Sequence, residues 1–167
     1  PVSVKEPCLI PDDVRILGLC TSGCFTEDQK ILFSQNNYQP IKSAMESNLK
    51  EVMVIKPGSV LEHLSFISEK IDHFMTDILP STQTIYEFHT QGGGSIQVTD
   101  SHPMLTAHGR LVDARSLKVG DSLIKYNGTE DQITEINKFD IYGYVYNLYP
   151  QSQNLQKNLI LAQSFIT

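Results

Sequence analysis

The stretch Arg110-Leu111-Val112-Asp113-Ala114, followed by Leu117-Lys118, decides the fold class because the chain contains the same pattern twice. The earlier copy is Pro40-Ile41-Lys42-Ser43-Ala44, followed by Leu49-Lys50. In each case a short apolar pair and a turn come before the pattern. Repetition of this kind predicts a duplicated unit whose two copies bury their apolar faces against each other.

Further similarities keep the same order in the two halves. Ile67-Ser68-Glu69 corresponds to Ile133-Thr134-Glu135, and Ile85-Tyr86-Glu87-Phe88 corresponds to Val145-Tyr146-Asn147-Leu148. The first half carries an extra stretch near residues 57–64, so the spacing differs although the order does not. Residues 1–23 have no second copy and lie outside the repeat, as a flanking piece or an extra edge strand.

Most of the chain consists of short β-type runs separated by turn residues such as Gln91-Gly92-Gly93-Gly94 and Tyr126-Asn127-Gly128. The best helical candidate, Ser59 to Leu64, is short and follows Pro57-Gly58. We therefore predict an all-β domain with little helix. The expected strands cover residues 30–33, 51–55, 84–88, 95–99, 122–125, 132–136, 144–148 and 158–162.

Composition and charge exclude several function classes. The 167 residues carry 13 Lys and Arg against 19 Asp and Glu, a formal charge of −6, so we expect no nucleic-acid partner. The chain has no apolar run of about 18 residues, and we expect no membrane span. The first residues, Pro1 to Lys5, do not have the shape of a signal peptide.

The three cysteines, Cys8, Cys20 and Cys24, all lie near one end of the chain. An odd number of cysteines in one region does not form a disulfide framework. Cys20 and Cys24 lack the second pair of ligands that a zinc site needs. We therefore expect no metal and no cofactor.

Two short segments carry groups that could react with each other. Cys24 directly follows Gly23, whose carbonyl has no side chain to screen it, and a thiol is a better nucleophile than a hydroxyl near neutral pH. Thr99 and His102 lie at the end of the first half of the repeat. A thiol, a hydroxyl and an imidazole could therefore meet at the centre of the duplication. Outside such a context, both Thr99 and His102 would be ordinary structural residues.

These segments resemble the Hint family, the autoprocessing module of hedgehog proteins and inteins. Gly23-Cys24-Phe25-Thr26 is similar to the opening block of that family, and Val98-Thr99-Asp100-Ser101-His102 is similar to its Thr-x-x-His motif. His89-Thr90-Gln91-Gly92-Gly93 resembles the hedgehog branch, and Leu117-Lys118-Val119-Gly120-Asp121 matches a turn found in both branches. The resemblance covers residues 24–167 and implies a duplicated β disc with pseudo-two-fold symmetry. Residues 1–23 would then be a flanking segment.

The resemblance implies self-cleavage through a thioester. Cys24 would attack the Gly23 carbonyl in an N-to-S acyl shift. His102 would protonate the departing amine of Cys24, and Thr99 would hydrogen-bond the scissile peptide or the oxyanion. An external nucleophile (water, a thiol, an amine or a sterol) would then release the N-terminal segment. Asp72 falls roughly where hedgehog-type members carry an acid that activates this second nucleophile.

Some residues depart from the family pattern. The chain ends Ala162-Gln163-Ser164-Phe165-Ile166-Thr167, without the His-Asn pair of inteins, so we expect cleavage on the N-terminal side rather than splicing. We expect a monomer whose own N-terminal segment is the substrate, and the resemblance leaves a secreted or cell-surface host protein open. Two other hypotheses remain: a decayed Hint scaffold that binds a partner or serves as structure, and a protease acting in trans with Cys24 and His102.

Overall fold

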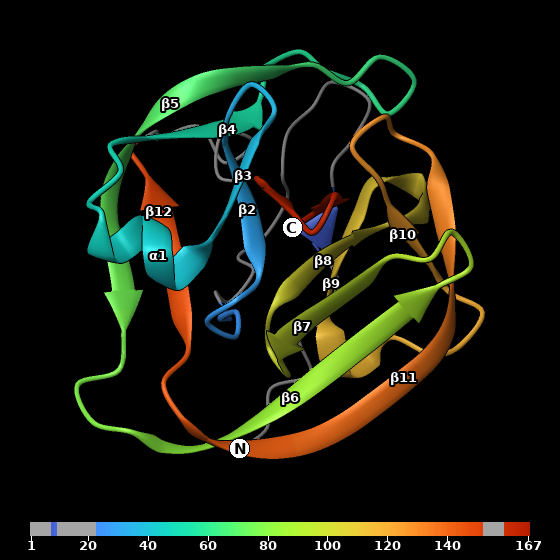
Figure 1. Ribbon diagram of the computed structural model, residues 1–167. Coiled ribbons are helices and arrows are strands. Elements are labelled where there is room, and N and C mark those ends of the chain that lie inside the picture. The colour runs from blue at the N-terminus through green and yellow to red at the C-terminus, as the bar shows by residue number, and fades with distance from the viewer. Residues whose placement is uncertain (1–7, 10–22, 152–158) are drawn as a thin grey trace.

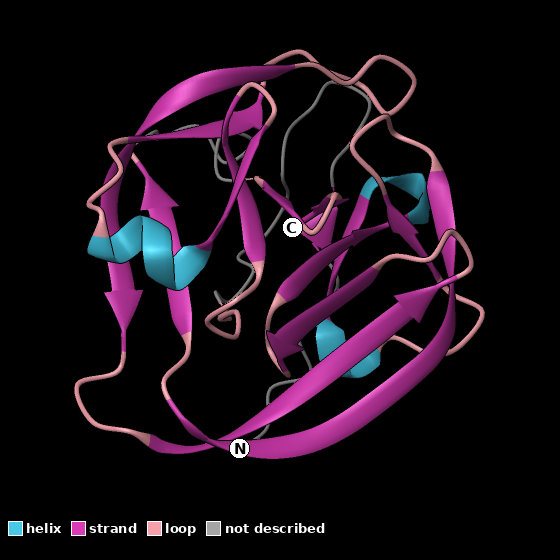
Figure 2. Ribbon diagram, viewed as in Figure 1, coloured by secondary structure: helices cyan, strands magenta, loops and turns pink. Residues whose placement is uncertain are grey.

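Strands dominate the computed structural model of the chain, which describes residues 8–9, 23–151 and 159–167 (Figure 2). The described strands form three sheets, and every strand pair within them is antiparallel. The chain is therefore all-β, as predicted. The largest sheet has the order β1 (Cys8–Leu9), β9 (Arg110–Asp113), β8 (Pro103–Thr106), β10 (Ser122–Ile124), β11 (Glu130–Gly143), β6 (Ser81–Thr90) and β7 (Ser95–Thr99).

Two smaller sheets complete the disc (Figure 1). One has the order β12 (Tyr146–Pro150), β5 (Phe66–Thr76) and β4 (Glu51–Ile55). The other has the order β14 (Phe165–Ile166), β13 (Leu161–Ala162), β2 (Lys30–Ser34) and β3 (Asn37–Pro40). The short helical pieces are α1 (Ile41–Glu46) and the 3₁₀ turns η1 (Ala107–Gly109) and η2 (Ala114–Ser116).

The order of the elements repeats, as the sequence pattern predicts. The hairpin of β2 and β3 is followed by α1, the short strand β4, the long strand β5 and then β6. The hairpin of β8 and β9 is followed by η2, the short strand β10, the long strand β11 and then β12. The two copies of the sequence pattern do not occupy the same element, because Ile41 to Ala44 lie in α1, whereas Arg110–Asp113 forms β9 and only Ala114 begins the following turn η2. The order of the elements, rather than this pattern, carries the repeat in the structure.

The two halves exchange strands. The long strand β5 of the first half pairs with β12 of the second, and Met75 lies opposite Asn147. The long strand β11 of the second half pairs with β6 of the first, and Ile136 lies opposite Phe88. Figure 1 shows β5 and β12 together on one side of the disc and β6 and β11 together on the other. Neither half completes its own sheet, so the duplicated units form one disc around a shared centre.

Phe25 lies at this centre and is fully buried. It belongs to the larger core cluster, together with Val98 of β7 and Tyr146 of β12. Burying an aromatic side chain of this size contributes about 1.5–3 kcal/mol to folding. A core residue therefore directly follows Cys24 and fixes the position of that thiol between the two halves.

The helix predicted at Ser59 to Leu64 does not form, and that prediction is wrong. His63 pairs with Val60 in an isolated bridge, and the stretch consists of turns. Leu61 and Leu64 are partly buried and pack against the smaller core cluster. The helix that does form, α1, begins after Pro40, whose φ of −55° suits a helix start.

Candidate active site

The Gly23–Cys24 peptide bond lies where the two halves meet. Phe25, the next residue, bridges Val98 of β7 and Tyr146 of β12. The Phe25 N–H donates to the Tyr146 carbonyl at 2.7 Å, and the Tyr146 N–H donates to the Phe25 carbonyl at 2.9 Å. These bonds hold the backbone of the junction between strands that come from different halves of the repeat.

A tight turn explains the spacing between Thr99 and His102. The His102 N–H donates to the Thr99 carbonyl at 3.1 Å, and the His102 carbonyl accepts from the Ala114 N–H at 2.9 Å. The turn begins where β7 ends, so both side chains are presented at the junction. The Cys24 N–H donates to Thr99 Oγ1 at 2.9 Å, and the Thr99 N–H donates to the Cys24 carbonyl at 2.9 Å. Thr99 therefore contacts the nitrogen side of the Gly23–Cys24 peptide.

The His102 ring is buried beside Gly23. The centroid of the His102 ring lies 4.3 Å from that of the Phe25 ring, and His102 is only 3% exposed. Gly23 is buried against the His102 backbone, because a Cβ added to Gly23 would lie 2.4 Å from His102 Cα. Among the described residues, neither ring nitrogen of His102 has a hydrogen-bond partner. Burial lowers the pKa of His102 to about 3, opposed only in part by the Gly23 backbone, so the ring is neutral at pH 7.

The Cys24 thiol is partly buried at the same place. Burial, together with the negative charge of Asp77, raises the pKa of the Cys24 thiol to about 11. The thiol is therefore protonated at neutral pH. A reaction at this sulfur needs a group that accepts its proton.

Asp72 lies elsewhere. It is on β5 with its carboxylate 55% exposed, and it pairs with His73 Nδ1 at 2.7 Å. The carboxylate close enough to raise the pKa of Cys24 belongs to Asp77, which follows β5 and accepts a hydrogen bond from the Val145 N–H at 3.2 Å. Asp77 follows Asp72 by five positions, about 16 Å along an extended chain. The structure brings Asp77, and not Asp72, to the junction.

Asn147 of β12 also reaches the junction, although the sequence analysis did not single it out. Its Nδ2 donates to the Gly23 carbonyl oxygen, and the residue is only 7% exposed. A usable signal was present in the sequence, because Asn147 lies inside a run of apolar and aromatic residues predicted to be a strand. A buried carboxamide needs hydrogen-bond partners, so such an Asn is a candidate for a specific contact.

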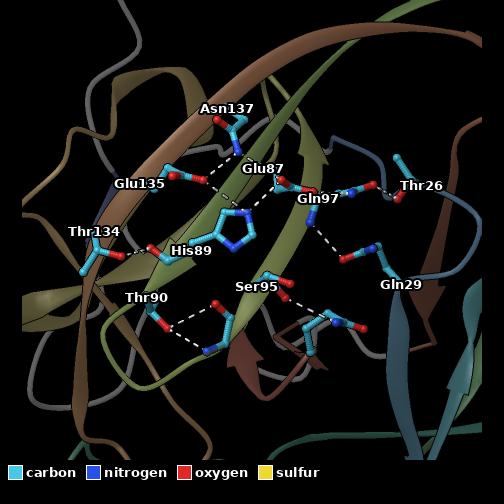
Figure 3. Close-up of polar contacts among 12 residues, drawn as sticks. Thr26, Gln29, Glu87, His89, Thr90, Ser95, Gln97, Thr134, Glu135 and Asn137 are labelled. Atoms are coloured by element: carbon cyan, nitrogen blue, oxygen red, sulfur yellow. Dashed lines mark hydrogen bonds and ion pairs between the residues drawn. The ribbon is translucent and has the colours of Figure 1, made fainter.

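A second polar cluster surrounds His89 (Figure 3). His89 Nε2 lies 2.7 Å from a Glu87 carboxylate oxygen and 3.8 Å from one of Glu135. Glu87 also accepts from Gln97 Nε2 at 2.5 Å and from Asn137 Nδ2 at 3.2 Å. Hydrogen bonds from His89 and Gln97 lower the pKa of Glu87. His89 therefore lies in a hydrogen-bonded environment formed by side chains of β6, β7 and β11.

Two further features bear on function. Within the ranges that the structure describes, no three His, Cys, Asp or Glu side chains are grouped in a way that could hold a metal ion. None of the helices in those ranges combines the length and apolar character needed to cross a membrane.

Comparison with known proteins identifies the architecture. The duplicated disc defines a class of fold, and solved structures of inteins share that fold. The DnaB intein from Synechocystis sp. PCC 6803 has a TM-score of 0.66 at 19% identity, covering 87% of this chain and 96% of its own. The gp41-1 intein has a TM-score of 0.62 at 15% identity, covering 88% of this chain and 98% of its own.

A bacterial intein-like domain from Clostridium thermocellum has a TM-score of 0.67 at 16% identity, covering 88% of this chain and 98% of its own. No family model and no curated protein matches the sequence. At these identities the similarity establishes the fold. The chain has the Hint fold, also called the intein-like fold.

Proposed function

We propose that this chain is a self-cleaving domain that converts the Gly23–Cys24 peptide bond into a thioester. The observation that carries the proposal is the placement of that bond, which is buried between the two halves with Thr99 on its N–H and the His102 ring beside it. This arrangement supports division into a flanking segment, residues 1–23, and a catalytic domain, residues 24–167.

The first step is an N-to-S acyl shift. The Cys24 thiol gives its proton to the neutral His102 ring, and Sγ forms a bond to the Gly23 carbonyl carbon. The electron pair of the carbonyl double bond moves to oxygen. The tetrahedral intermediate then collapses and breaks the C–N bond, and the Cys24 nitrogen takes the proton from His102. His102 thus acts first as base and then as acid, because an amide anion is not a viable leaving group.

Thr99 orients the nitrogen that departs. Its Oγ1 accepts the Cys24 N–H at 2.9 Å, which fixes the plane of the scissile peptide. In the second step an external nucleophile attacks the thioester carbonyl and regenerates the Cys24 thiol, with release of residues 1–23. The sequence suggests Asp72 as the acid that activates this nucleophile. We assign this part to Asp77 instead, because its charge acts on Cys24, whereas Asp72 is exposed and pairs with His73.

Incubation with a small thiol tests this function. The purified chain mixed with dithiothreitol should be cleaved at the junction into two fragments, residues 1–23 and residues 24–167. Hydroxylamine should convert the same thioester to a hydroxamate on Gly23. Cys24→Ala should not react, whereas Cys20→Ala, which removes a thiol outside the junction, should react like the wild type. Intact mass spectrometry measures all of these products.

Absence of any mass loss over days, between about pH 6 and 9, would contradict self-cleavage. A decayed scaffold that serves only for binding or structure is the second candidate. The observation that favours it is that burial holds both reactive groups in their neutral forms, with the pKa of Cys24 at about 11 and that of His102 at about 3. A decayed scaffold predicts that wild type and Cys24→Ala behave alike in the same assay.

A further inference from the structure

Asn147 contacts the oxygen of the scissile Gly23–Cys24 peptide, whereas Thr99 contacts its nitrogen. Asn147 Nδ2 donates to the Gly23 oxygen, while Thr99 Oγ1 accepts the N–H of the same peptide bond. Both ends of the scissile peptide are therefore held by side chains, one from β12 and one from β7. The two strands come from different halves of the repeat.

The orientation of the Asn147 carboxamide is fixed by its two partners. Asn147 Oδ1 accepts from the Leu148 N–H at 2.8 Å. A backbone N–H can only donate and a carbonyl oxygen can only accept, so Oδ1 must face Leu148 and Nδ2 must face Gly23. The side chain is also buried, so water does not compete for the carbonyl. The donor is in place before any charge develops.

A fixed donor on a carbonyl oxygen has a specific effect on nucleophilic attack. The oxygen becomes negative when sulfur adds, and a preorganised hydrogen bond in a buried site stabilises that charge more than it stabilises the neutral carbonyl. Thr99 Oγ1 lies instead on the nitrogen side of the bond, where it accepts from the Cys24 N–H.

We propose that Asn147 is a catalytic residue of the acyl shift, and that its Nδ2–H stabilises the oxyanion formed on Gly23. The inference rests on the proposed self-cleavage. In this step the bond from Cys24 Sγ to the Gly23 carbon forms, the carbonyl electron pair moves to the oxygen facing Asn147, and the thiol proton passes to His102. Asn147 keeps both of its amide protons throughout. Removal of one such donor lowers the rate of a reaction by about 100- to 1000-fold.

Kinetics with matched variants test the catalytic role. Asn147→Leu removes the donor, and Asn147→Asp keeps the acceptor for Leu148 but places an acceptor where the donor was. Both variants should form the thioester about 100- to 1000-fold more slowly than wild type, measured as dithiothreitol-dependent cleavage. Asn137→Leu is the control, since Asn137 donates to Glu87 and Glu135 in the cluster around His89. It should react within about threefold of wild type.

Carbon NMR tests the contact without any chemistry. In a Cys24→Ala background the chain has a single Gly-Ala pair, so labelling glycine at the ¹³C carbonyl and alanine with ¹⁵N selects the Gly23 carbonyl alone among the 10 glycines. Loss of the hydrogen bond in Asn147→Leu should move this resonance upfield, and Asn137→Leu should leave it in place. The spectrum also shows whether each variant is folded.

The outcomes separate the two proposals. Slow thioester formation in both Asn147 variants, with an upfield shift in Asn147→Leu, supports the catalytic role. Cleavage of a folded Asn147→Leu or Asn147→Asp chain at the wild-type rate overturns it while leaving self-cleavage intact. An inert wild type overturns self-cleavage and the catalytic role together. An unchanged Gly23 resonance in Asn147→Leu overturns the contact itself.

Discussion

His102 and His89 lie in opposite environments within one small domain. His102 is buried at the junction beside Phe25, and neither of its ring nitrogens has a partner among the described residues. His89 is 39% exposed and lies between the carboxylates of Glu87 and Glu135. A paired histidine stabilises a surface, whereas an unpaired buried histidine costs folding free energy and is retained for another reason.

The difference teaches where to look for chemistry in this fold. In the cluster around His89, the ring pairs through Nε2 with Glu87, and Glu87 also accepts from Gln97 and Asn137. At the junction, by contrast, the buried His102 ring lies beside Gly23 and Phe25, and neither of its nitrogens has a partner among the described residues. Three experiments test this contrast, from the largest expected effect to the smallest.

The first experiment removes each ring in turn. His102→Ala should lower the rate of thiol-dependent cleavage by about 100-fold or more, because general acid–base catalysis contributes that much. His89→Ala should change the rate by less than about threefold, because an exposed ion pair contributes only about 0–1 kcal/mol. Intact mass spectrometry over time gives both rates. Equal losses in the two variants would remove the distinction between the two sites.

The second experiment measures stability against pH in the inactive Cys24→Ala chain. The pKa of His102 is about 3 in the folded state and near 6.5 in the unfolded chain. Between these values the unfolded chain binds a proton that the folded chain excludes. The free energy of unfolding should therefore fall as the pH drops below about 6.5, by up to about 1.4 kcal/mol per pH unit from this residue.

Urea unfolding at several pH values measures this fall. The double variant Cys24→Ala, His102→Gln lacks the titrating ring and should lose less stability over the same interval. The other acids and histidines contribute equally to both chains, so the difference between the two curves isolates His102. Parallel curves would show that the ring is not held in its neutral form.

The third experiment crowds the buried side of the junction. A Cβ added to Gly23 would lie 2.4–2.6 Å from three His102 atoms, two of which are backbone and cannot swing away. In the Cys24→Ala background, Gly23→Ala should lower the free energy of unfolding by about 1–3 kcal/mol. Gly143→Ala is the matched control, because nothing lies within 4 Å of its added Cβ. Equal stability in the two variants would mean that the junction is loosely packed.

The sequence predicts the parts of the site that depend on local structure. The turn between Thr99 and His102 is short, so the Thr-x-x-His spacing alone brings the two side chains together. Cys24 is fixed by the apolar residue that follows it, and Phe25 is recognisable as a core residue from its type. The repeat likewise predicts two similar halves, although its two copies are displaced against the elements, since Ala44 is the fourth residue of α1 and Ala114 is the first of η2.

The parts that depend on long-range pairing could not be predicted in this way. Strand β5 was not expected, because Phe66–Thr76 carries several charged residues and none of its residues is fully buried. Its position is set by pairing with β4, the strand before it, and with β12, which is distant in sequence. The prediction of Asp72 as the acid at the junction had the same weakness, because the length of β5 decides which acid lies at the end of the strand. Asn147 reaches Gly23 only because β12 crosses to the other half.

The strand exchange also sets the order of events during synthesis. Phe25 pairs with Val98 of β7 and with Tyr146 of β12, which follows it by 121 positions in the sequence. Contacts across such long loops form late in folding, because closing them costs chain entropy before any contact is gained. The Gly23–Cys24 junction therefore reaches its folded position only after β12 has been synthesised. If the proposed self-cleavage occurs, it cannot precede this pairing.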